Sequence, residues 1–585
     1  MSYKAPLDDM NFLLNQVFKV EESLGDIAAF GDFDSELYSA ILEEAAKFSE
    51  NVLFPLNRNG DEQGCQFENG VVTTPQGYRQ AYQEFCQSGW QSTCGDPEYG
   101  GQGLPKSLHV LVEEMTYSAN TSFCLYSSLT SGAYHAIHAH ASDTLKQLYL
   151  PPMLEGRWSG AMGLTEPHAG SDLGIIKTKA ADNGDGTYQI SGTKIFITGG
   201  EHDLAENIIH LVLAKLPGAP AGPKGISLFL VPKIKVDSEG NLGQTNGVSC
   251  GSIEHKMGIK ASATCVMNFD NAEGYLVGQE NKGLMAMFTM MNLERLSIGI
   301  QGIGLAETSY QLAKAYAEER VQGRNAQGQA ATILQHADVR RMLLEQRACV
   351  EPARALAVFM GMQIDKQYFH TNAQHQQKSA SLMAILTPIA KAFFTDKGFD
   401  ACNHGVQVLG GHGYIREWGL EQLVRDAKIA QIYEGTNGIQ AQDLLVRKLC
   451  LDKSGLFEML CEQIEAELKV EASEQTAQDL KRQLEKALEQ FKQTSNWLRS
   501  EFTERGYELQ GGAVDYLHAA GYLVYGWMWL KMLNALNDKV DAQLSARKRL
   551  AGHYFAQQQL PQLHQHCRKV ELGYQAVMAA EDSLI

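Results

Sequence analysis

The sequence lacks the cysteine spacings of zinc ribbons and dithiol redox sites. Its eleven cysteines include no Cys-x-x-Cys pair and are scattered over positions 65, 86, 94, 124, 250, 265, 349, 402, 450, 461 and 567. Scattered cysteines, odd in number, are typical of a large protein in a reducing compartment. The group His135, His138 and His140 has no carboxylate or cysteine placed to complete a metal site. We therefore expect a cytoplasmic protein that holds no metal.

The sequence also shows no pattern typical of a targeting or membrane-spanning segment. The first residues, MSYKAPLDDMNFLLNQVF, contain no basic region followed by a long apolar run, so we expect no secretory signal. The most apolar stretch, residues 517–536, contains His518 and Lys531 and is flanked by Asp515 and Asp538. These polar residues favour a buried helix over a membrane span.

Basic residues are too few for a general affinity for nucleic acid. The 585-residue chain has 50 Lys and Arg against 68 Asp and Glu, which gives a net charge of −18. Attraction to phosphate backbones or anionic membranes needs a basic surface. A local basic pocket for a small phosphate-bearing ligand remains compatible with this charge.

Changes of pattern along the chain predict a mainly α protein with a central β domain. After an N-terminal extension (1–35), residues 36–160 show helical spacing, and residues 161–280 contain short β-rich runs separated by turn residues. Residues 281–450 return to long helical patterns, which predict a helix bundle. Residues 451–585 are again helical and begin with mixed charge, typical of a solvated helix face.

Three motifs that contain glycine stand out from this background. They read LTEPHAGSD (164–172), GTKIFITGG (192–200) and LGGHGYIREW (409–418). Small residues let a backbone approach a ligand closely, and Phe196 and Thr198 share one face of a strand. Taken singly, each motif also fits an ordinary turn, strand or helix end, because none is a P-loop or a dinucleotide fingerprint.

A fourth motif, RDAKIAQIYEGTNGIQ (425–440), places Glu434 between an apolar lead-in and a glycine-rich turn. An acidic residue near a helix start is common for electrostatic reasons alone. Together, however, the four motifs closely resemble the acyl-CoA dehydrogenase family over residues 36–450. The long C-terminal region further resembles the large bacterial subgroup that includes the 3-methylmercaptopropionyl-CoA dehydrogenases.

The resemblance implies an N-terminal helical domain, a middle antiparallel β-sandwich or barrel and a C-terminal four-helix bundle, extended here by a further helical domain. It also implies non-covalent FAD between the β domain and the bundle. The matching cofactor-binding residues are Leu164, Thr165, Ser171, Phe196, Thr198, Arg320, Gln407, Gly410, Gly411 and Thr436. Four of them, Arg320, Gln407, Gly410 and Gly411, would reach a neighbouring subunit's FAD, which implies an oligomer. Because the added C-terminal region could cover the surface that builds tetramers in smaller members, we expect a homodimer.

Three positions depart from the residues usual in the family. Phe196 stands where Trp is common, which keeps a stacking surface but loses the indole N–H. Gln322 precedes Gly323 where Phe-Gly is usual, and Gly438 replaces a Gln. The last change removes one expected side-chain hydrogen bond to the cofactor.

The resemblance implies α,β-dehydrogenation of an acyl-CoA thioester to the trans-2-enoyl-CoA. Glu434 would remove the α-proton while Cβ delivers a hydride to flavin N5, and hydrogen bonds to the thioester oxygen would stabilise the enolate. Some members, including isovaleryl-CoA dehydrogenases, carry the base on an earlier helix, where this chain has Glu294. Because both glutamates are present, as in members that use the later one, we assign catalysis to Glu434 and expect Glu294 to line the pocket or pair with a cation.

Substrate contacts are expected from Ser171, Arg295, Tyr433 and Gly435, with Arg295 near the CoA adenosine. The expected substrates are fatty acyl-CoA or 3-methylthiopropionyl-CoA, and the expected electron acceptor is an electron-transfer flavoprotein. An acyl-CoA oxidase is an alternative with the same fold. A DNA-binding alkylation-response relative is another, although that branch relies on a basic C-terminal region.

Overall fold

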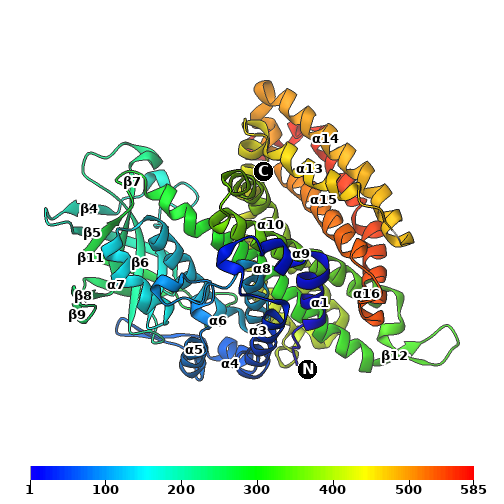
Figure 1. The fold of residues 1–585 in the computed structure, drawn as a ribbon, viewed down its shortest axis with the longest axis horizontal. Coiled ribbons are helices and arrows are strands. Elements are labelled where there is room, and N and C mark those ends of the chain that lie inside the picture. Colours follow the sequence, from blue (N-terminus) through cyan, green and yellow to red (C-terminus); the bar gives the residue numbers. More distant parts are fainter. Residues whose placement is uncertain (1, 473) are drawn as a thin grey trace. The chain divides into compact units, whose positions relative to one another are not determined.

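The computed structural model describes residues 2–472 and 474–585. It separates into two compact units (Figure 1). The helical unit consists of Met1–Lys47, Pro105–Ser118 and Ile298–Ile585, and the β unit of Phe48–Leu104 and Ala119–Ser297. Helices α6 (Lys106–His140) and α8 (Gly283–Glu319) contribute residues to both units, and α6 is kinked at Asn120.

A seven-stranded mixed sheet forms the centre of the β unit. Its strands are β3 (Trp158–Gly163), β4 (Lys179–Asp182), β5 (Tyr188–Thr198), β6 (Asn207–Lys215), β7 (Ile226–Pro232), β10 (Val248–Ile253) and β11 (Thr264–Val277). The pairings β5–β11, β11–β7, β7–β6, β6–β4 and β4–β5 close on themselves, as in a barrel. The expected middle β domain is therefore present, but it is not purely antiparallel, because β3 and β4 both pair with β6 in parallel.

Strands β6 and β7 are buried along almost their whole length because apolar clusters cover both faces of the sheet. Ile209 and Leu211 of β6 belong to a cluster with Trp158, whereas Ile208 and Val212 belong to the opposite cluster. The other elements of this unit are α4 (Phe54–Gln63), β1 (Gln66–Glu68), β2 (Val71–Thr73), α5 (Tyr78–Gln87), α7 (Asp143–Leu154), β8 (Ile234–Val236) and β9 (Leu242–Thr245).

The helical unit contains the bundle helices, the N-terminal segment and the added C-terminal domain. The N-terminal helices are α1 (Leu7–Phe12), α2 (Val20–Leu24) and α3 (Ser35–Phe48). The bundle adds the short hairpin β12 (Val321–Arg324) and β13 (Ala330–Thr332), and α9 (Ala337–Phe369), α10 (Ala373–Leu409), α11 (Leu420–Lys428) and α12 (Asn437–Gln442). The C-terminal helices are α13 (Leu456–Leu468), α14 (Gln475–Leu509), α15 (Ala513–Asn534), α16 (Ala542–Tyr554), α17 (Gln562–Leu572) and α18 (Gln575–Met578).

Capping and burial explain where these helices begin and how α15 packs. The side chains of Asn372 and Asp541 accept backbone N–H groups at the starts of α10 and α16, as N-cap residues do. Helix α15 is apolar nearly all round and almost entirely buried, so the apolar stretch of the sequence is a core helix. Within residues 2–472 and 474–585, no helix is both long and apolar enough to cross a membrane.

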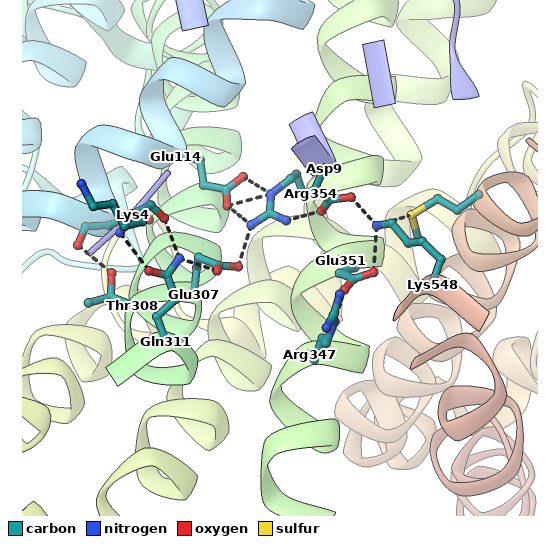
Figure 2. A network of polar contacts seen from close by, with 12 residues as sticks. Lys4, Asp9, Glu114, Glu307, Thr308, Gln311, Arg347, Glu351, Arg354 and Lys548 are labelled. Carbon is teal, nitrogen blue, oxygen red and sulfur yellow. Dashed lines mark hydrogen bonds and ion pairs between the residues drawn. The ribbon is translucent and has the colours of Figure 1, made fainter. Parts of the chain in front are cut away.

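A buried charge network joins the three parts of the helical unit (Figure 2). Arg354 of α9 is fully buried, and its Nε donates to both carboxylate oxygens of Glu114 at 2.9 Å. Its Nη2 contacts Glu307 Oε2 at 2.8 Å, and its Nη1 donates to Asp9 in the N-terminal segment. Lys548, from the C-terminal domain, also pairs with Asp9.

Charge pairing keeps Asp9, at the centre of this network, ionised. Lys548 contacts Glu351 Oε2 at 2.8 Å, beside its pair with Asp9. Burial alone would raise the pKa of Asp9, but Lys548 and Arg354 outweigh burial and hold it below its usual value. Opposite charges therefore tie the N-terminal segment and the C-terminal domain to the bundle.

Candidate active site

Glu434 lies on a short loop between two helical segments of the helical unit. Helix α11 continues into a 3-10 turn at Ile429–Gln431, and α12 begins at Asn437. The backbone of Glu434 has a φ of 55°, in the left-handed region, and Gly435 has a φ of 85°. A non-glycine residue in this region is held there by its surroundings, and such residues are concentrated at functional sites.

Buried polar groups fix the loop on the side that follows Glu434. Lys391 of α10 is fully buried, and its Nζ donates to Gly435 O (2.8 Å) and to Asn437 Oδ1 (2.9 Å). Gln440 Nε2 donates to the backbone carbonyl of Glu434 at 3.2 Å. Thr436 Oγ1 accepts the N–H of Ile439, so Thr436 is also the N-cap of α12. Lys391 and Gln440 carry no signal in the sequence, because helical periodicity does not show which polar residues face a distant loop.

The residues before Glu434 have different surroundings. Tyr433 is half-buried, and its hydroxyl donates to Gln301 Oε1 of α8 at 2.5 Å. Ile432 is 50% exposed in this chain. Of the two residues before Glu434, Ile432 therefore lies at the surface of the helical unit, and Tyr433 is hydrogen-bonded to α8.

Phe196, in the β unit, is turned outward by a bulge in β5. The register between β5 and β11 shifts between the pairs Met267–Lys194 and Cys265–Ile197, and Phe196 has a φ of 58°. Such bulges bend a strand and redirect a side chain. The ring is 59% exposed, whereas the neighbouring Ile197 is buried, so Phe196 presents an aromatic surface.

The LTEPHAGSD segment is attached to this bulge. Ile195 N donates to Thr165 O at 2.9 Å, which brings Leu164 and Thr165 beside Phe196. Leu164 is buried, Thr165 and Thr198 are half-buried, and Ser171 is exposed. These five candidate cofactor residues therefore belong to one region of the β unit.

A buried ion pair, which the motifs do not reveal, supports the same segment. Lys194 Nζ donates to Glu166 Oε1 (2.9 Å) and to Leu164 O (3.0 Å), and both side chains are buried. Thr178 and Lys177 also donate to the Glu166 carboxylate. Burial alone would raise the pKa of Glu166, but Lys194 and these hydrogen bonds lower it to about 2. The buried Glu166 carboxylate therefore holds this loop in place. In the sequence, only its position within the LTEPHAGSD motif distinguishes it from other acidic residues.

Replacing Glu166 with Gln should lower the free energy of unfolding at pH 7 by about 2 kcal/mol, because Lys194 loses its charged partner. The folded pKa of Glu166, about 2, is below its ordinary value of 4.5, so the stabilisation is complete above pH 4.5 and is lost as the pH falls toward 2. Urea unfolding of both proteins should show the difference narrowing below pH 4.5. In the control Glu273→Gln, which breaks the more exposed pair with Lys235, the loss should stay below about 1 kcal/mol. A pH-independent difference for Glu166→Gln would contradict the assignment.

The remaining cofactor candidates lie at one end of the bundle. Helix α10 ends at Leu409, and Gln407, Gly410 and Gly411 are exposed. Side-chain atoms added at either glycine would meet no neighbour within 4 Å, so the backbone there is open to a ligand. Tyr316 of α8 bonds His412 Nδ1 at 2.9 Å, which places this loop beside the end of α8, where Arg320 is exposed.

Glu294 and Arg295 are neighbours on α8 within the β unit. Glu294 is 3% exposed and faces Gly132 of α6, where an added Cβ would lie 2.5 Å from Glu294 Oε1. Arg295 contacts Asn292 Oδ1 at 3.3 Å and lies over the ring of Phe288. The absence of a side chain at Gly132 makes room for the Glu294 carboxylate.

His138 and His140 of α6 have separate partners rather than a common ligand. His138 Nε2 pairs with Asp96 Oδ2 at 2.9 Å, and His140 Nε2 with Thr289 Oγ1 at 2.7 Å. Among the described residues, no group of three or more His, Cys, Asp or Glu side chains could hold a metal ion.

The exposed surfaces at Phe196 and at Gly410 and Gly411 fit a flavin dinucleotide chemically. The exposed Phe196 ring suits stacking on a flat heterocycle. The open glycine backbone at Gly410 and Gly411 suits a pyrophosphate, which accepts backbone N–H groups.

Four family models match successive parts of the chain. They are described as the acyl-CoA dehydrogenase N-terminal domain (residues 35–157), middle domain (161–272) and C-terminal domain (281–449), and as acetyl-CoA dehydrogenase C-terminal like (460–581).

Known proteins resemble the chain over almost its whole length. A 3-methylmercaptopropionyl-CoA dehydrogenase from Ruegeria pomeroyi is 41% identical over 98% of this chain and 99% of its own. The broad-specificity linear acyl-CoA dehydrogenase FadE5 of Mycobacterium tuberculosis is 32% identical over 96% of both chains. A structure of an acyl-CoA dehydrogenase complexed with FAD from Bacillus anthracis has a TM-score of 0.76, at 22% identity over 95% of this chain and 90% of that one.

Proposed function

Because the chain belongs to the acyl-CoA dehydrogenase family of FAD-dependent oxidoreductases, we propose that it converts an acyl-CoA thioester to the trans-2-enoyl-CoA with Glu434 as the catalytic base. The family expectation from the four sequence motifs is thereby confirmed. One observation supports the assignment of Glu434 most directly. It is the left-handed loop that holds this carboxylate away from the helical path of its neighbours.

In the proposed reaction the chain's own residues handle the proton. The Glu434 carboxylate takes the α-proton, and its backbone N–H donates to the thioester oxygen, where negative charge develops. Gly435 leaves space for the thioester, and Lys391 holds the carbonyl of Gly435. FAD, held by the residues named next, would supply the acceptor for the hydride that leaves Cβ. Leu164, Thr165, Ser171, Phe196, Thr198 and Thr436 would bind its flavin half, and Arg320, Gln407, Gly410 and Gly411 its phosphate half.

Glu294 has a different proposed role. Its burial against Gly132 supports a wall of the acyl pocket rather than a second base. Arg295, on the next position of α8, would contact the CoA adenosine, and Ser171 and Tyr433 would border the acyl thioester.

The proposed substrates are fatty acyl-CoA esters or 3-methylthiopropionyl-CoA. The names of the two full-length relatives support both choices, since one is a 3-methylmercaptopropionyl-CoA dehydrogenase and the other acts on linear acyl-CoA. We further propose an electron-transfer flavoprotein as electron acceptor, a homodimer that shares the Gly410–Tyr414 surface, and a cytoplasmic location. Tyr414, 85% exposed, supports the shared surface, because an aromatic side chain this exposed is suited to an interface.

Anaerobic titration of the FAD-loaded protein with acyl-CoA esters tests the proposed function. Straight chains of several lengths, branched chains and 3-methylthiopropionyl-CoA should be compared. At least one should bleach the flavin absorbance and yield one enoyl-CoA per flavin. If none does, the proposed function is wrong. If the bleached protein reacts with air at the rate of turnover and forms peroxide, it is an oxidase instead.

A further inference from the structure

A single carboxylate holds both ends of the segment that carries Glu434. Asp396 Oδ1, on α10, accepts hydrogen bonds from Gln431 Nε2 (2.8 Å) and Asn437 Nδ2 (2.7 Å). Gln431 comes three residues before Glu434, and Asn437 three residues after it. Displacement of the Asp396 side chain therefore removes one hydrogen bond from each end of this short loop.

The second oxygen of Asp396 is held from the added C-terminal domain. His518 of α15 lies with its Nε2 2.9 Å from Asp396 Oδ2. Burial alone would raise the pKa of Asp396, but the interactions with His518, Asn437 and Gln431 outweigh burial and lower it. An ionised carboxylate can only accept hydrogen bonds, so His518 Nε2 is the donor.

Close packing fixes the position of His518. Its ring meets Phe393 of α10 edge-on, with ring centres 5.6 Å apart. One turn further along α15, an added Cβ at Gly521 would lie 2.3 Å from Phe393 Cγ, so the two helices can approach closely only because this residue is glycine. On its other side His518 faces His566 of α17, whose Nδ1 bonds Asp515 Oδ1 at 2.6 Å.

We propose that His518 is a positioning residue, through which the C-terminal domain sets the geometry of Glu434 by orienting Asp396. The proposal rests on the assignment of Glu434 as the base. His518 takes no part in the proton transfer itself. Its hydrogen bond instead selects one orientation of Asp396, and that orientation fixes Gln431 and Asn437 on either side of the base. Proton transfer depends steeply on such geometry, and misplacement of reacting groups by about 1 Å can slow a reaction about 100-fold.

Three variants of the full-length FAD-loaded enzyme test this proposal. His518→Phe keeps an aromatic ring against Phe393 but removes the donor. His518→Gln supplies an amide N–H of similar reach. His564→Gln changes an exposed histidine of the same domain and serves as a control. Rates of anaerobic flavin reduction, Kd for acyl-CoA, FAD content and thermal midpoints should be measured for each.

We expect His518→Phe to slow flavin reduction about tenfold while FAD content and acyl-CoA affinity stay within twofold of wild type. His518→Gln should recover most of the rate, and His564→Gln should match wild type. A wild-type rate in His518→Phe would overturn the proposal. So would an equal loss in both His518 variants together with equally lowered thermal midpoints, since packing alone would then account for the effect.

Glu434→Gln separates this proposal from the proposed function. If wild type is bleached but Glu434→Gln is bleached equally fast, Glu434 is not the base and the route through Asp396 is wrong, whatever His518 does. If no acyl-CoA bleaches the wild type, the enzymatic function itself is wrong. If Glu434→Gln reduces flavin slowly but His518→Phe reduces it at the wild-type rate, only the positioning role of His518 is rejected.

Discussion

Glu434→Gln should slow flavin reduction by acyl-CoA about 1,000-fold, within the range that a general base contributes. Gln has nearly the shape of Glu and keeps the backbone N–H, so the variant should still bind FAD and acyl-CoA. Only the group that accepts the α-proton is lost. Stopped-flow reduction under anaerobic conditions measures the rate, and the flavin spectrum of the unreacted complex measures binding.

Glu294→Gln is the matched comparison for this variant. It removes a carboxylate that is buried against α6 in the β unit, and it should reduce flavin within about tenfold of the wild-type rate if Glu294 only lines the pocket. Full bleaching in Glu434→Gln, with loss of bleaching in Glu294→Gln, would move the catalytic role to Glu294. Loss in both variants would mean that the two carboxylates act together.

Arg354→Leu should lower the free energy of unfolding of the helical unit by about 3–5 kcal/mol, the range found when one partner of a buried ion pair is removed. The fully buried guanidinium contacts Asp9, Glu114 and Glu307, so the variant leaves three carboxylates facing an apolar side chain. Urea unfolding followed by far-UV circular dichroism measures the loss.

Arg341→Leu provides a control on the same helix. Arg341 pairs with Asp338 three residues away, and both side chains are largely exposed. Exposed pairs contribute about 0–1 kcal/mol, so this variant should unfold close to wild type. Equal unfolding midpoints for the Arg341 and Arg354 variants would show that the buried network does not stabilise the fold.

The sequence was sufficient for the fold class but not for the surroundings of the candidate residues. Strict alternation along β5 puts Lys194, Phe196 and Thr198 on one face. In the structure Lys194 is fully buried and Phe196 is exposed, because the bulge inserts one extra residue between them. A bulge depends on the register of the partner strand, which has no local trace in the sequence. The parallel pairing of β3 with β6 likewise depends on which strand lies alongside, and this also has no local trace in the sequence.

Contacts between segments far apart in the chain could not be predicted from the motifs either. The motif around Glu434 singled out its position. Asp396, by contrast, lies in a long helical pattern, and His518 lies in the apolar stretch 517–536, and neither pattern shows which residue each would contact. Their pairing joins residues far apart in the chain, and helical periodicity only reports which residues share a face of one helix. The same limit applies to Asp9, whose partners Arg354 and Lys548 lie in the bundle and in the C-terminal domain.

The buried charge network has a consequence for synthesis of the protein. Asp9 is made long before Lys548, because the bundle and most of the C-terminal domain lie between them in the chain. Until then Asp9 and Glu351 lack one of their cations, and a buried carboxylate without its full complement of charge is unfavourable. The β unit can fold as soon as its own strands are complete, as domains of a growing chain do. The helical unit, by contrast, reaches its final packing only after Lys548 has been made, so a chain truncated before Lys548 should remain a substrate for chaperones and proteases.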